Sequence, residues 1–125
     1  MRRKVFKESP ENAMFRAYQT NLNASGFGQV FVSPDVDAVE WDIYQISVVT
    51  QTANTNTHCM IRHNGFFLCS TPKGWEDTSV GPPDAVVLAH DILAIQWISG
   101  SPNELATAGI WYNENPSGTT YSSAH

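Results

Sequence analysis

The longest run of strand-forming residues in the chain extends from residue 39 to residue 52 and contains no glycine or proline. Hydrophobic and acidic residues alternate in its first half, which is the pattern of a β-strand with one buried face. The apolar positions of that half are Val39, Trp41 and Ile43. In the second half they move by one residue, to Tyr44, Ile46 and Val48. Either a β-bulge near Ile43-Tyr44 keeps both halves on one core, or a central strand is apolar on both faces.

Seven shorter segments also have the composition or alternation of β-strands, with turn residues between them. They are residues 15–20, 27–32, 57–62, 66–70, 85–89, 92–98 and 105–112. Residues 93, 95 and 97 lie on one side of their strand, and the even-numbered residues from 106 to 112 alternate with the odd-numbered residues from 105 to 111. The pattern predicts an all-β fold: a single antiparallel β-sandwich or jelly-roll-like domain of about eight strands.

The segments outside these strands set the expected boundaries. We expect a basic N-terminal arm at residues 1–13, a β-sandwich domain at 14–113 and a polar C-terminal tail at 114–125. Ser9-Pro10-Glu11 has the residues of a helix start and predicts at most one helical turn. Residues 71–84 are expected to form the one long loop, and loops of about 12–15 residues are uncommon unless they have a function.

Charge is distributed unevenly along the chain. Four of the seven basic residues lie in the first seven positions, whereas residues 8–125 hold three basic and twelve acidic residues. The acidic body argues against nucleic acid as the main ligand, because neutralising phosphates requires a basic surface. The basic start is either an arm that docks on an acidic protein surface or a solvated chain end.

The sequence predicts neither a membrane span nor export. No apolar run approaches the roughly 20 residues that cross a bilayer. No apolar signal-peptide core follows Arg2-Arg3-Lys4. We therefore expect no membrane partner, and synthesis into a cytoplasm.

Cys59 and Cys69 flank a hairpin signal, His63-Asn64-Gly65. A three-residue loop with Gly65 in the left-handed conformation would set the two cysteines opposite each other. A two-residue Asn-Gly turn would point them to opposite faces. Two cysteines make no disulfide framework, and we expect two buried thiols in a reducing compartment.

Candidate catalytic and metal-binding residues are few. His90-Asp91 invites a catalytic interpretation because an aspartate can orient a histidine base, but adjacent residues rarely reach that geometry and the dipeptide suits a tight turn. Oxygen-rich segments at Asp35-Val36-Asp37 and at Glu76, Asp77 and Asp84 are candidates for calcium, although their spacing matches no known loop. Zinc spacing, a nucleophile elbow and a phosphate loop are all missing from the sequence. We expect no catalytic residue, no metal and no cofactor.

The four tryptophans fall into two groups. Trp41, Trp97 and Trp111 lie within predicted strands and are expected in the core. Trp75 lies in the predicted long loop. There it either anchors a partner or stacks on a sugar, or else it folds back over one end of the sandwich.

Four segments between Tyr44 and Glu114 carry a resemblance to known proteins. They are Tyr44-Gln45-Ile46-Ser47-Val48-Val49-Thr50, Cys59-Met60-Ile61-Arg62-His63-Asn64-Gly65, Gly81-Pro82-Pro83 and Leu88-Ala89-His90-Asp91-Ile92-Leu93-Ala94-Ile95-Gln96-Trp97. This block, a little over half of the chain, resembles small β-sandwich virion proteins of tailed bacteriophages, of the type found in phages that infect actinobacteria. In similar proteins the turn before the tryptophan-bearing strand commonly carries Gly-Asp, where this chain has His90-Asp91.

The resemblance implies a non-enzymatic virion protein: a capsid decoration or minor capsid protein that binds the assembled shell, often as a homo-oligomer. The alternative is a tail or tail-tip component, or a carbohydrate-binding module for the host envelope. The implied partners are the phage major capsid protein or other virion proteins, in particles assembled in the host bacterial cytoplasm. The residues expected to bind a partner are Arg2, Arg3, Lys4, Phe6, Lys7 and Trp75.

Overall fold

The computed structural model describes residues 14–34, 36–71, 73–80 and 86–116. Within these ranges the chain forms nine β-strands. They are β1 (Met14–Asn21), β2 (Gly28–Val32), β3 (Val39–Thr50), β4 (His58–His63), β5 (Phe66–Thr71), β6 (Glu76–Val80), β7 (Val86–Val87), β8 (Leu93–Ile98) and β9 (Leu105–Pro116). The described part of the chain holds no helix long and apolar enough to span a bilayer. The predicted helical turn at Ser9-Pro10-Glu11 lies outside the described residues.

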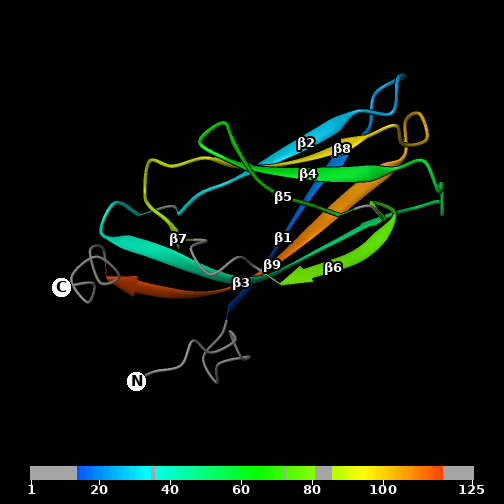
Figure 1. The fold of residues 1–125 in the computed structure, drawn as a ribbon. Coiled ribbons are helices and arrows are strands. Elements are labelled where there is room, and N and C mark those ends of the chain that lie inside the picture. Colours follow the sequence, from blue (N-terminus) through cyan, green and yellow to red (C-terminus); the bar gives the residue numbers. More distant parts are fainter. Residues whose placement is uncertain (1–13, 35, 72, 81–85, 117–125) are drawn as a thin grey trace.

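The strands form two antiparallel sheets that pack as two layers (Figure 1). Sheet A has the order β1-β9-β3-β6, with β7 also paired to β3, and sheet B has the order β2-β8-β4-β5. The pairing is nested: β1 with β9, β2 with β8, β3 with β6 and β7, and β4 with β5. One long hairpin rolled into two layers gives this order, which is that of a jelly roll. The predicted all-β sandwich is therefore confirmed.

Strand β3 contains a bulge where the alternation slips. Its pairing with β9 runs from Ile43 opposite Tyr112 directly to Gln45 opposite Trp111, so Tyr44 has no opposite residue in that ladder. The extra residue reverses the alternation, so the apolar side chains of both halves of the strand face the space between the sheets. The buried side chains on the two sides of the bulge are Trp41, Ile43, Ile46 and Val48.

The core lies between the sheets and draws on both. One side of β8 and one side of β9 are buried in it, with exposures from 0 to 1%. The residues on these sides are Leu93, Ile95, Trp97, Ala106, Ala108, Ile110 and Tyr112. Burying each large apolar side chain contributes about 1.5–3 kcal/mol. Trp41 is also buried, but the expectation for Trp111 was wrong: this side chain alternates to the outer face of sheet A, where it is half buried.

The prediction of one long loop at residues 71–84 was wrong, because this segment contains β6. Strand β6 pairs with β3, and Glu76 lies opposite Val49. Its sequence shows no apolar alternation, as is common for a strand at the edge of a sheet. Strand β9 is also longer than predicted and reaches Pro116, which pairs with Val39 at the start of β3.

Asn64 and Gly65 form the two-residue turn of the β4-β5 hairpin, both with positive φ (52° and 86°). This turn alone would set Cys59 and Cys69 on opposite faces. Strand β5 has a bulge at Leu68 that shifts its register by one residue. Cys69 thereby returns to the inner face that Cys59 occupies, diagonally across the two strands, and no disulfide joins the two cysteines.

Candidate functional site

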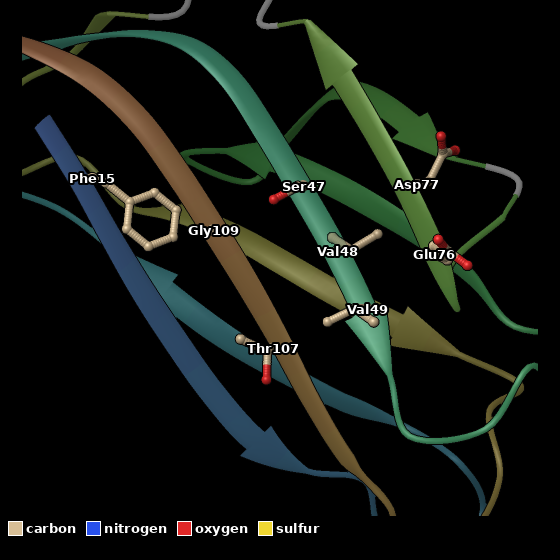
Figure 2. Close-up of a pocket in the computed structure, with 8 residues that line it drawn as sticks. All are labelled: Phe15, Ser47, Val48, Val49, Glu76, Asp77, Thr107 and Gly109. Atoms are coloured by element: carbon tan, nitrogen blue, oxygen red, sulfur yellow. The ribbon is translucent and has the colours of Figure 1, made fainter. Parts of the chain in front are cut away.

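A shallow groove of about 610 Å³ lies on the outer face of sheet A (Figure 2). It crosses β1, β9, β3 and β6. Its lining residues are Phe15, Ser47, Val48, Val49, Glu76, Asp77, Thr107 and Gly109. Two apolar side chains in it remain about half exposed, Phe15 at 50% and Val49 at 47%. The groove therefore offers apolar surface to a ligand from solvent.

Gly109 leaves room for the ring of Phe15 within the groove. A Cβ at this position would lie 2.7 Å from Phe15 Cε1 and 3.0 Å from Ser47 Oγ. The ring also packs on Trp111, its cross-strand neighbour, with centroids 4.5 Å apart and planes tilted by 48°. An aromatic ring on one strand often packs over a glycine on the neighbouring strand and covers the backbone that the glycine leaves bare. Phe15 is thus held in place although it belongs to an edge strand.

Strand β6 lies on the other side of the groove from Phe15 and brings one carboxylate to the outer face, that of Glu76 (Figure 2). Asp77 also contributes to the lining, but it lies opposite the buried Val48, so its side chain alternates to the inner side, where its charge acts on the buried Cys59. Glu76 and Asp77 belong to the edge strand β6 and lie opposite Val49 and Val48 of β3. The lining contains no basic side chain. A ligand in the groove meets an apolar surface and negative charge along one side. The arrangement suits a ligand that combines an apolar or stacking group with positive charge or hydroxyl donors.

Trp75 directly precedes β6 and is half buried. Its carbonyl oxygen accepts a hydrogen bond from the Thr50 N–H at 3.0 Å, and Lys73 Nζ lies 6.0 Å from the centre of its ring. The next residue, Glu76, lines the groove, whereas Trp75 is not part of the lining. The other residues predicted to bind a partner lie outside the described part of the chain: Arg2, Arg3, Lys4, Phe6 and Lys7.

Asp91 is paired with His63 rather than with its neighbour His90. His63 Nε2 lies 3.0 Å from Asp91 Oδ2, and the side-chain amide of Asn64 donates to Asp91 Oδ1 at 2.9 Å. The backbone N–H of Leu88 donates to Asp91 Oδ2 at 3.0 Å. Asp91 therefore joins the tip of the β4-β5 hairpin to the turn before β8.

The surroundings of Asp91 favour its ionised form. Burial raises the pKa of this carboxyl, but hydrogen bonds from Asn64, Leu88 and His63 outweigh burial and leave the pKa below the ordinary value for aspartate. The predicted tight turn is confirmed, since the Asp91 N–H donates to the Leu88 carbonyl at 3.0 Å. The pairing with His63 escaped the sequence analysis because 28 residues separate the partners. The available signal was that both residues lie at predicted turns.

The described residues contain no group of three or more His, Cys, Asp or Glu side chains placed to hold a metal ion. Of the calcium candidates, Asp37 places its Oδ1 atom 3.4 Å from His90 Nε2, and both side chains are 87% exposed. Glu76 and Asp77 lie in the groove. The remaining candidates, Asp35 and Asp84, lie outside the described residues.

The outer face of sheet B exposes phenylalanines, which the sequence analysis did not single out. Phe31 lies opposite Ala94, Ala94 opposite Arg62, and Arg62 opposite Phe67, so one row crosses all four strands. Phe31 and Phe67 are each 57% exposed. Ile92, directly before β8, is also exposed at this end of the sheet, and we call the set the phenylalanine face: Phe31, Phe67 and Ile92. Phe66 is exposed as well, but it lies opposite His63 and alternates to the other face.

Arg62 lies within the row that carries Phe31 and Phe67. Its Nε donates to Gln96 Oε1 at 3.3 Å, and the Gln96 amide donates to Gln29 Oε1 at 3.1 Å. These hydrogen bonds hold the guanidinium on the sheet surface. Exposed aromatic rings around an arginine are the composition of an interface hot spot.

Comparison of the chain with known proteins found no match, whether with family models, with curated proteins or with solved structures. The strands form a small all-β domain of two antiparallel sheets packed as a sandwich.

Proposed function

We propose that this protein is a non-enzymatic structural component of a tailed bacteriophage particle, which attaches to the assembled capsid shell as a decoration or minor capsid protein. The observation that carries the proposal is the phenylalanine face on sheet B. Three large apolar side chains gathered at one end of a sheet, each at least half exposed, are unusual on a small domain. They mark a surface that is covered by a partner.

The phenylalanine face fits a protein partner of definite chemistry. Burying Phe31 and Phe67 would remove from water the apolar area that dominates interface energetics. Arg62 between them selects a partner that brings a carboxylate or a carbonyl oxygen to an otherwise apolar patch. A shell repeats such a patch many times, so weak contacts suffice where several copies engage together.

The jelly-roll order supports the proposal by analogy only. Jelly rolls occur both in viral capsid proteins and in lectins, and one fold hosts many unrelated functions. The sequence resemblance to phage virion proteins favours the capsid. The basic segment at residues 2–7 remains a candidate for further contacts with the shell, since a basic segment complements an acidic surface. Trp75 remains a second candidate.

Binding to purified shells of the virus that encodes the chain tests this proposal. We expect a Phe31→Ser/Phe67→Ser variant to lose occupancy on the shell at least tenfold, with its unfolding curve nearly unchanged because both side chains are exposed. Val49→Ser, on the outer face of the other sheet, is the matched control and should bind like wild type. A particle that contains none of this protein by mass spectrometry, or equal occupancy for all three proteins, would refute the proposal.

A second copy of the chain is the alternative occupant of the phenylalanine face. The resemblance implies a homo-oligomer, and an exposed apolar surface also suits self-association. Light scattering after size-exclusion chromatography separates the two cases. Dimers or trimers that dissociate in the Phe31→Ser/Phe67→Ser variant would assign the face to self-association.

The groove on sheet A favours a second candidate function, a carbohydrate-binding tail component for the host envelope. Phe15 and Trp111 form an aromatic surface, and the carboxylate of Glu76 can accept hydrogen bonds from hydroxyls. Binding on an array of bacterial envelope glycans tests it. Phe15→Ala should abolish binding and Phe31→Ala should preserve it, whereas an array without any signal would remove this candidate.

A further inference from the structure

We propose that the groove on the outer face of sheet A is the docking site of the chain's own basic N-terminal segment, residues 1–13. The inference concerns the isolated protein and does not depend on the function proposed above. It rests on the charge of the groove, on its apolar surface and on the place where the segment joins the sheet.

Charge complementarity selects this occupant. The segment carries four basic and two acidic residues, the basic ones being Arg2, Arg3, Lys4 and Lys7. On its outer face the groove offers the carboxylate of Glu76 and no basic side chain. The described body as a whole has three basic and eight acidic side chains, so its field also favours a basic segment.

The apolar part of the groove has a counterpart in the same segment. Val5 and Phe6 lie between Lys4 and Lys7 in the sequence. A chain that places its basic groups near Glu76 therefore brings apolar side chains close to the exposed surface of the groove. Apolar contact supplies binding energy that exposed ion pairs alone do not.

The attachment point puts the groove within reach. Strand β1 starts at Met14, and the next residue, Phe15, already lines the groove. Three strand spacings separate β1 from β6, about 14 Å across the sheet, and Glu76 is level with Gln19, about 17 Å along the sheet from Met14. Thirteen extended residues span up to about 43 Å, so Arg2, Arg3 and Lys4 reach Glu76 even after the chain reverses direction once. The short tether also gives the segment a high effective concentration at its own groove.

A nitroxide on the segment tests the docking. We place it at Ser9→Cys in a Cys69→Ser background, where the remaining Cys59 is buried. Docking should broaden the amide signals of Val49 and Thr107 severalfold relative to the protein with reduced nitroxide. Raising the salt concentration from about 0.02 M to about 0.5 M should restore most of the signal, because the Debye length falls below the width of the groove.

Charge-matched variants decide between the groove and the rest of the body. Glu76→Gln should relieve the broadening, and Asp37→Asn, which removes the same charge elsewhere, should leave it unchanged. A mixture of ¹⁵N-labelled protein without nitroxide and unlabelled protein with it reports docking between copies. Equal effects of the two variants, or broadening only in the mixture, would overturn the proposal.

Discussion

The ring of Phe15 lies in the space that Gly109 leaves free on the neighbouring strand. A Cβ at Gly109 would come within 2.7 Å of Phe15 Cε1. Phe15 occupies an edge strand and is half exposed, so burial alone does not fix its position. The absence of a side chain at Gly109 on β9 fixes the position of the ring instead. The groove on sheet A exists because these two residues are neighbours.

Gly109→Ala is expected to lower the free energy of unfolding by about 1 kcal/mol, because the new methyl group displaces the ring of Phe15 and strains its packing on Trp111. Urea denaturation measures the loss. Phe15→Ala removes the ring, so adding Gly109→Ala to it should cost almost nothing. If Gly109→Ala lowers the free energy of unfolding as much in the Phe15→Ala background as in wild type, the methyl group contacts something other than Phe15.

Deleting Tyr44 is expected to leave the fold intact. The flanking residues Ile43 and Gln45 already lie opposite consecutive residues of β9, so the deletion removes the bulge without changing the register. Loss of the buried ring should cost roughly 3 kcal/mol in urea denaturation. Deleting the half-exposed Ser47 is the matched control. It shifts one half of the strand by one residue, turns its apolar side chains outward and should abolish cooperative unfolding.

The pairing of Asp91 predicts a stability that declines in acid. Its folded-state pKa is lowered, so its contribution is present above the unfolded pKa of about 3.9 and is lost as pH falls through the folded pKa. Asp91→Ala should cost about 2 kcal/mol at pH 7, because it leaves the Leu88 N–H and the Asn64 amide without their acceptor. The difference from wild type should shrink as the pH falls below about 4.

Asp37→Ala provides the control for Asp91. Asp37 also lies near a histidine, but both side chains of that pair are 87% exposed. Exposed pairs contribute about 0–1 kcal/mol, so this variant should unfold almost like wild type at every pH. Equal losses in the two variants would mean that the network around Asp91 adds nothing beyond a surface pair.

The two cysteines are expected to remain thiols under oxidising conditions. Diagonal neighbours on adjacent strands lie about 7–8 Å apart, which is too far for a disulfide. Burial raises the pKa of Cys59 to about 12, so iodoacetamide at pH 8 should label this thiol only when the protein unfolds. Mass spectrometry after labelling with and without urea checks both points. An internal disulfide after mild oxidation would show that the strands move apart.

The fold was readable from the sequence wherever a strand has one buried face. The slip between Ile43 and Tyr44 is visible in the alternation and predicts the bulge. Strand β6 escaped detection because a polar edge strand has no alternation to detect. The bulge at Leu68 escaped because Phe66, Phe67 and Leu68 are all apolar, so a slip there leaves no trace in the pattern.

The groove was beyond the sequence analysis for a different reason. Phe15, Gly109 and Glu76 become neighbours only through the order of strands in sheet A. That order depends on long-range pairing, and local patterns do not encode it. The phenylalanine face has a partial signal in Phe67 close to the Asn-Gly turn, but Phe31 joins it only once β2 lies next to β8.

The place of β9 in sheet A has a consequence for how the chain is made. This strand is the last of the described strands to be synthesised, yet it lies between β1 and β3. Until residues 105–116 emerge from the ribosome, β1 has no neighbour in its sheet and β3 has no neighbouring strand on one of its two edges. The domain therefore closes only after nearly all of it has been translated. A nascent chain halted before Leu105 exposes strand edges that aggregate or recruit chaperones.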